Sequence, residues 1–151
     1  GSLGRSKADM LRVIEWTVAE LPEDRPRHLL GIGGVEDILA AVDRGVDTFD
    51  CAAPTRLARN GVLLTLAEDG FRIAIKNARF ARDDRPVEEG CDCPTCAQYP
   101  RAFLRHLVQT GELSYYRLAT LHNVRFMVRF LDRVRTALAE GRPASSSVLN
   151  P

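Results

Sequence analysis

The sequence lacks any apolar run that approaches the roughly 20 residues of a membrane span, so we expect no membrane association. Residues 1–10 also lack the apolar segment of a secretory signal peptide. Cysteine is scarce: the 151 residues include four, and three of them form one cluster. That distribution is typical of a reducing compartment, and we expect a cytoplasmic protein. The formal net charge of +1 indicates no partner by itself.

The amino-acid composition fits a globular protein, with 45% hydrophobic and 27% charged residues. The charge is unevenly distributed, because residues 101–135 contain seven arginines and only two acids, Glu112 and Asp132. Such a region is basic enough to meet a polyanion. Arg125, Arg129 and Arg133 recur at helical spacing and share one helix face. That face is either a phosphate-binding stripe or simply a solvated surface.

The cysteine cluster is the most informative pattern in the chain. Cys91, Cys93 and Cys96 lie within six residues, and His122 follows later. Three thiolates and one imidazole complete a tetrahedral zinc site with no open position, so we expect one structural zinc per chain. The alternatives are cysteines packed as small apolar residues or paired as disulfides. Three thiols this close on a polar turn cannot all be core residues, and Cys91 and Cys93 are poorly placed to bridge.

Residues 7–50 show the alternation of a parallel α/β unit. Ser6 and Asp9 form a capping pattern before an amphipathic helix that Pro22 ends. A short buried strand is expected at 28–30, a helix at 35–44 and a second strand at 46–50.

The alternation then breaks. Residues 63–66 and 71–75 predict a β-hairpin around the turn 67–70. Pro100 and Gly111 predict a helix over 100–110. Thr120 is expected to cap a last helix that runs to about residue 140, before a frayed tail. The predicted inner stripe of that helix is Phe126, Val128, Phe130, Val134 and Leu138.

Two αβ units cannot close a barrel, so the architecture is typical of the last strands of a βα barrel with a zinc-bearing insertion. Several motifs then resemble one family, the bacterial tRNA-guanine transglycosylases (queuine tRNA-ribosyltransferases). The resemblance covers nearly the whole chain, to about Gly141. Its motifs are residues 21–33 (LPEDRPRHLLGIG), Phe49-Asp50-Cys51, Pro54-Thr55-Arg56, Ala58-Arg59-Asn60-Gly61, Asn77-Ala78-Arg79-Phe80, the three cysteines and His122-Asn123.

The resemblance implies an α/β fold, the C-terminal portion of a TIM (β/α)8 barrel with an inserted zinc-binding subdomain. Residues 1–60 would then contain barrel strands seven and eight, and residues 61–120 the hairpin and zinc subdomain. Residues 121–141 would form the final barrel helix, and 142–151 a flexible tail.

The resemblance also implies an activity, the exchange of the anticodon wobble guanine of tRNA for a 7-deazaguanine base. Asp50 would be the nucleophile of this pentosyltransferase. The bottom-up argument agrees, because catalytic residues of βα barrels follow strand ends and a carboxylate can trap an oxocarbenium-like ribose as an ester. The alternative for Asp50 is a capping or salt-bridge carboxylate.

Other positions take roles from the same resemblance. Leu3, Leu30 and Gly31 would line the base pocket, and Arg56, Arg59 and Asn60 would follow the tRNA anticodon loop. For Arg56 and Arg59 the alternative is solvated side chains. His28 and His106 match no ligand of the family and are expected to be packing or surface residues, and Cys51 to be packed.

The resemblance further implies a homodimer. Because six barrel strands would be missing from this chain, we expect it to show no exchange on its own. A different class of function stays open, namely a catalytically inactive, zinc-stabilised module for tRNA binding or dimerisation.

Overall fold

The structure is a computed structural model that describes residues 6–148. These described residues separate into two compact units, 6–53 with 133–148, and 54–132. The long helix α6 (Leu113–Ala139) contributes residues to both. Among the described residues, no helix combines the length and the apolar character that crossing a membrane requires.

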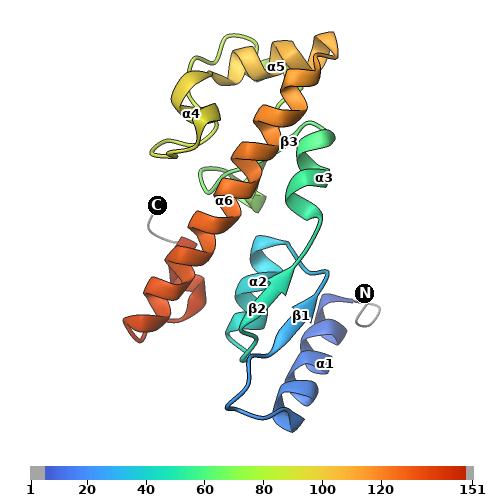
Figure 1. Cartoon of the computed structure of the whole chain (residues 1–151), viewed down its shortest axis with the longest axis vertical. Helices are drawn as coiled ribbons and strands as arrows, with labels where there is room; N and C mark the ends of the chain where they lie inside the picture. The colour runs from blue at the N-terminus through green and yellow to red at the C-terminus, as the bar shows by residue number, and fades with distance from the viewer. Residues whose placement is uncertain (1–5, 149–151) are drawn as a thin grey trace. The chain divides into compact units, whose positions relative to one another are not determined.

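The first unit is a parallel α/β unit, as predicted. It consists of α1 (Lys7–Glu20), β1 (His28–Leu30), α2 (Val35–Val42), β2 (Thr48–Asp50) and the 3-10 helix η3 (Ala144–Val148). The Ser6 side chain caps α1 by accepting a hydrogen bond from the Asp9 amide at 3.1 Å. β1 and β2 are parallel and lie side by side in Figure 1, with His28 opposite Thr48 and Leu30 opposite Asp50.

The core of this unit lies between its two helices and its sheet. Met10 and Ile14 of α1 pack with Ala41 of α2 and with Val46, and Leu29 and Phe49 add partly buried side chains. The expectation of a buried first strand is wrong, because His28 and Leu30 are exposed and only Leu29 is half-buried. β1 and β2 form a sheet of two strands within the described residues, so no further strand covers them.

The second unit begins with α3 (Ala53–Arg59) and the predicted hairpin. The antiparallel strands β3 (Val62–Leu64) and β4 (Arg72–Ala74) pair Leu63 with Ile73. Ile73 and Ile75 are buried while the residues between and beside them are exposed, which confirms the predicted alternation. The 3-10 turn η1 (Asp69–Phe71) lies between the two strands, and a second one, η2 (Ala78–Phe80), follows β4. The helices α4 (Pro94–Gln98), α5 (Arg101–Thr110) and α6 come next.

This unit has a core of its own. Leu63, Ile73 and Ile75 of the hairpin region pack with Phe80, Leu104, Leu107 and Tyr115. α5 begins after Pro100 and ends at Gly111, which adopts φ of 75°, as the sequence predicted.

The last helix differs from its prediction. α6 begins at Leu113, so Thr120 lies inside it and caps nothing. Tyr115 and Ala119 are both fully buried one turn apart, and packing of this face extends the helix beyond the local capping signal. Of the predicted inner stripe, Phe126, Phe130 and Val134 are buried, whereas Val128 and Leu138 are exposed.

The segment after α6 also differs from its prediction. The described part of the expected flexible tail forms η3, in which Ala144 and Ser147 are buried. The Ala144 amide donates to an Asp43 carboxylate oxygen at 2.9 Å, which holds η3 beside the end of α2.

Candidate metal centre and carboxylate site

The cysteine cluster is a tight turn that leads into α4. Cys93 is the N-cap of this helix, and its sulfur accepts a hydrogen bond from the Cys96 amide at 3.3 Å. Pro94 takes the first helical position, where its fixed φ suits a helix start and its missing N–H is not needed. Thr95 then donates its hydroxyl to the Leu118 carbonyl at 2.8 Å, which fastens α4 to α6.

His122 of α6 faces these thiols. The His122 Nδ1 atom lies 3.9, 3.6 and 3.2 Å from the sulfurs of Cys91, Cys93 and Cys96. The four ligand atoms all lie within 4.8 Å of one another. Around a tetrahedral zinc, with bonds of about 2.3 Å to sulfur and about 2.0 Å to nitrogen, neighbouring ligand atoms lie about 3.5–3.8 Å apart. The cluster therefore fits zinc, and its four cysteine and histidine ligands are those that the sequence predicted.

A backbone carbonyl fixes the orientation of the histidine ring. His122 is fully buried, and its Nε2 lies 2.7 Å from the Leu64 carbonyl oxygen. A carbonyl only accepts, so Nε2 carries the proton and the lone pair of Nδ1 faces the thiols. Metal-binding histidines are commonly oriented by such a second contact.

Asn123 fixes the strand that supplies this carbonyl. The Asn123 amide is fully buried; its oxygen accepts from the Leu64 amide at 2.9 Å, and its nitrogen donates to the Pro54 and Val62 carbonyls, both at 3.0 Å. His122 and Asn123 together hold β3 on α6 at the metal centre. This is the physical role of the His-Asn pair in the sequence.

The thiols affect one another's ionisation. Hydrogen bonds from the Cys91 and Cys96 thiols hold the pKa of Cys93 far below its usual value. The same close contacts with Cys91 and Cys93 raise the pKa of Cys96. The three sulfurs thus lie close enough to share one cation. A divalent cation that replaces the thiol protons stabilises all the thiolates together.

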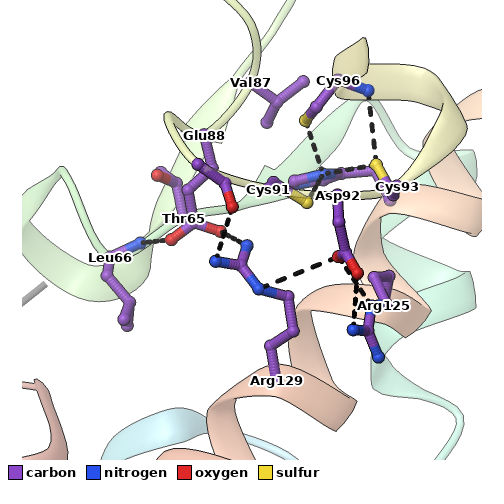
Figure 2. A network of polar contacts seen from close by, with 12 residues as sticks. Thr65, Leu66, Val87, Glu88, Cys91, Asp92, Cys93, Cys96, Arg125 and Arg129 are labelled. Carbon is purple, nitrogen blue, oxygen red and sulfur yellow. Dashed lines mark hydrogen bonds and ion pairs between the residues drawn. The ribbon is translucent and has the colours of Figure 1, made fainter.

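Two arginines of α6 contact the cysteine turn (Figure 2). Arg125 donates from Nε and Nη2 to the two carboxylate oxygens of Asp92 at 2.8 and 2.7 Å. Arg129 donates to the Gly90 carbonyl at 2.9 Å and lies 3.8 Å from the carboxylate of Glu88. These two arginines are therefore not a merely solvated surface, whereas phosphate binding by the arginine stripe stays a prediction.

Asp50 ends β2 in the first unit, as the barrel argument expected. Its side chain is 63% exposed. Its Oδ1 accepts from the Gly31 amide at 3.2 Å and lies 3.3 Å from Nε2 of His28. The carboxylate is thus held on one oxygen and is accessible to a ligand.

The structure places two of the predicted base-pocket residues beside Asp50. Leu30 is 66% exposed and pairs with Asp50 across the two strands. Gly31 has φ of 75°, a conformation that glycine adopts without strain, and its amide also donates to the Asp50 carbonyl at 3.0 Å. Leu3 lies outside the described residues.

The predicted tRNA-binding residues belong to α3 and its end. Arg56 and Arg59 are exposed there. The Asn60 side chain is also exposed, and its nitrogen donates to the Arg56 carbonyl at 2.9 Å. Asn60 therefore caps the end of α3, a structural contact that the sequence reasoning did not predict.

Sequence reasoning missed the position of His28. Its Nδ1 lies 2.8 Å from the Thr48 hydroxyl, so the ring bridges Thr48 and Asp50. The sequence carries no signal for this contact, because the register that places His28 opposite Thr48 and near Asp50 is fixed only when β1 and β2 pair.

Comparison with known proteins shows the family to which the sequence belongs. The sequence matches the family described as queuine tRNA-ribosyltransferase over residues 1–146. The chain belongs to this family. A relative from Archaeoglobus fulgidus is 50% identical over 147 residues, which cover 93% of this chain and 36% of that protein. The queuine tRNA-ribosyltransferases of Bacillus subtilis and Listeria welshimeri are 47% identical over 141 residues and 46% over 143.

This chain spans only part of these relatives. The match covers 93% of this chain and 36% of the Bacillus subtilis protein, and 95% and 37% for the Listeria welshimeri protein. The chain thus corresponds to about a third of the family's length. Its Cys3His group fits the structural zinc of the family.

Proposed function

We propose that this chain is the C-terminal part of a tRNA-guanine transglycosylase. The enzyme would exchange the anticodon wobble guanine of tRNA for a 7-deazaguanine base, and the tRNA anticodon loop would be its partner. The observation that carries this proposal is the exposed Asp50 carboxylate at the end of a parallel strand, in a chain of this family. Barrel enzymes place catalytic side chains at that position.

The chemistry requires a nucleophile on the ribose. Both contacts of the carboxylate fall on Oδ1, so Oδ2 is the oxygen that would attack C1′. The C1′–N bond to guanine breaks, the base leaves with its electron pair and takes up a proton, and an aspartyl ester forms. A ring nitrogen of the deazaguanine then attacks C1′, loses its proton and releases the carboxylate.

Zinc has no part in these steps. Four protein ligands leave it no open position, so the Cys3His group would hold a structural ion that ties the cysteine turn to α6. Residues beside Asp50 would take the other roles. Leu30 and Gly31 would pack on the base, with Leu3 also in that pocket, and Arg56, Arg59 and Asn60 would contact the anticodon loop.

The parallel pair β1 and β2 would be the seventh and eighth strands of a TIM barrel. Two features support this: their exposure, and the much greater length of the relatives, which leaves room for the other strands. Residues 1–60 would then be the barrel part and 61–120 the inserted subdomain. The final barrel helix, predicted to begin at 121, would be the later part of α6.

We also propose that the protein is a homodimer through the zinc-bearing unit. A shallow hollow beside the metal centre is lined by Pro94, Leu121, Val124 and Val128, and the last three are apolar side chains exposed on α6. Sedimentation should show a dimer that Val124→Asp weakens. An unchanged monomer at high protein concentration would contradict this arrangement.

The decisive experiment uses the full-length protein that contains this chain. Asp50→Asn should abolish both the covalent tRNA adduct on a denaturing gel and the incorporation of labelled guanine, while tRNA binding persists. Asp24→Asn removes a more exposed carboxylate from a loop and should retain exchange. Continued exchange by Asp50→Asn would overturn the mechanism.

One alternative function has specific support. The second unit has its own core and metal centre, so the chain could bind tRNA or dimerise without catalysis. If the full-length wild-type protein binds tRNA but never forms the adduct, this non-catalytic role replaces the enzyme.

A further inference from the structure

Three side chains of α6 reach one segment of chain, the turn from Glu88 to Cys96. His122, Arg125 and Arg129 are spaced at i, i+3 and i+7, so they share one face of the helix. His122 faces the thiols, while Arg125 and Arg129 contact the residues around Cys91. Three side chains of the helix therefore contact this turn, in addition to the Leu118 carbonyl that accepts from Thr95, and one of the three is a metal ligand.

The residues that the two arginines contact lie directly beside the metal ligand Cys91 in the sequence. Asp92, the partner of Arg125, is the single residue between Cys91 and Cys93, and Gly90, which accepts from Arg129, directly precedes Cys91. Two planar N–H···O bonds join Arg125 to Asp92, a geometry that fixes orientation as well as distance. The turn is thus held on α6 on either side of Cys91.

The two contacts differ in exposure. The Asp92 and Arg125 side chains are 60% and 39% exposed, whereas those of Glu88 and Arg129 are 9% and 21% exposed. The buried Glu88 carboxylate also accepts from the Leu66 amide at 3.2 Å, which links the turn to the end of the hairpin. The Arg129 contact is therefore the less screened of the two.

We propose that Arg125 and Arg129 are positioning residues of the metal centre, which retain zinc by clasping the cysteine turn to the helix that supplies His122. Three ligands lie on the turn and the fourth lies on α6, so the ion leaves when the turn separates from the helix. The clasp opposes that separation. Three thiolates and Zn²⁺ also leave one net negative charge, which the nearby guanidinium groups favour.

The test is the rate at which the purified 151-residue chain, loaded with zinc, releases the ion to a colorimetric chelator. Arg125→Gln should release zinc about fivefold faster, as suits an exposed bidentate pair. Arg129→Gln should release it about tenfold faster or more, because its contacts are better shielded. Arg125→Lys keeps the charge without the two-pronged geometry and should fall between wild type and Arg125→Gln. Arg117→Gln removes an exposed charge of α6 that makes none of these contacts and should match wild type.

Three controls separate a clasp from a general loss of stability. Asp92 contacts both arginines, since its Oδ1 also lies 4.0 Å from Nε of Arg129. The double variant Asp92→Asn/Arg125→Gln should therefore release zinc no faster than Asp92→Asn alone, because Arg125 has lost its partner in both. Raising salt from about 0.01 to 1 M, which shortens the screening length from about 30 to 3 Å, should accelerate wild type more than Arg125→Gln. Leu104→Ala lowers the melting temperature through the core and should leave zinc release nearly unchanged well below melting.

Rates within twofold of wild type for both Arg125→Gln and Arg129→Gln would overturn the proposal. So would an acceleration by Leu104→Ala that matches those variants at equal melting temperature. If Arg129→Gln fails to fold because Glu88 loses its partner, Arg125→Gln still decides. Failure of these rates would leave the proposed transglycosylase untouched, since Asp50 takes no part in zinc release.

Discussion

The two units of this chain differ in how much of their own structure they cover. In the first unit the paired strands present Leu30 to solvent. In the second unit the paired strands carry Leu63 and Ile73, and both are fully buried. Two pairs of equally short strands therefore lie in opposite environments. The second unit completes its core from its own residues, whereas the first leaves its sheet uncovered within the described residues.

The two sites follow the same difference. The metal centre is closed, with His122 and Asn123 fully buried and their polar atoms bonded to backbone groups or facing the thiols. The carboxylate site is open, because Asp50 is exposed and held on one oxygen only. A structural ion requires a complete set of ligands, whereas a nucleophile must remain accessible to its substrate. Burial therefore distinguishes the closed metal centre from the nucleophile that we propose.

Removing zinc should have the largest effect, because it should unfold one unit and spare the other. Structural zinc contributes about 10–16 kcal/mol in zinc-finger peptides, which exceeds the whole stability of many domains, about 5–15 kcal/mol. We expect Cys93→Ser or a strong chelator to unfold the second unit and to leave α1 and α2 protected in hydrogen exchange. Cys51→Ser is the matched control and should retain one equivalent of zinc. A full equivalent bound to Cys93→Ser would show that the ligand assignment is wrong.

Truncating one leucine in each unit should give the next largest difference, measured as the loss of unfolding free energy. Leu63→Ala removes a fully buried side chain and should lower the free energy of unfolding by about 2–5 kcal/mol. Leu30→Ala removes an exposed one and should change it by no more than about 0.5 kcal/mol. Urea denaturation of this chain measures both. In the full-length protein we expect the cost of Leu30→Ala to rise, and equal costs in both proteins would contradict a covered strand.

Acid should lower the folding stability of the second unit, because it protonates the Asp83 carboxylate. Its carboxylate binds Arg85 at 2.8 Å and the buried Arg101 at 3.3 Å, and the Arg85 hydrogen bonds hold the pKa of Asp83 well below its usual value. A lowered folded pKa stabilises the protein above the unfolded value of about 3.9, and this stability is lost as pH falls through the folded pKa.

The measurement is the stability difference between wild type and Asp83→Asn. It should be largest near pH 5 and shrink towards pH 2, because protonation removes the charge that the variant already lacks. Taking the difference cancels zinc loss, which affects both proteins. A difference that is constant with pH would show that the Asp83 charge contributes nothing.

The smallest expected effect lies inside the well-covered core. The Tyr115 ring is fully buried, and its hydroxyl has no hydrogen-bond partner among residues 6–148. Burial raises the pKa of Tyr115 for the same reason, since the oxygen has lost water. Tyr115→Phe should raise the free energy of unfolding by up to about 1 kcal/mol in urea denaturation. Tyr116→Phe alters an exposed neighbour and should be neutral; a clear loss of stability in Tyr115→Phe would reveal a hydrogen bond to the hydroxyl.

Features that depend on short-range geometry could be predicted from the sequence alone. Capping by Ser6, the alternation around Ile73 and the helix between Pro100 and Gly111 follow from local backbone and side-chain preferences. The four zinc ligands were also identifiable, because ligand chemistry restricts them to thiols and an imidazole.

Features that depend on what packs against a residue became visible in the folded structure alone. Folding moved the start of α6 from Thr120 to Leu113, because buried Tyr115 outweighs a weak capping preference. It exposed β1 and buried β3, although both are short and apolar. It also assigned Arg125 and Arg129 to the cysteine turn and His28 to Asp50. A charged or polar side chain takes its role from the partner that folding brings within reach, and the spacing of residues along the chain does not specify that partner.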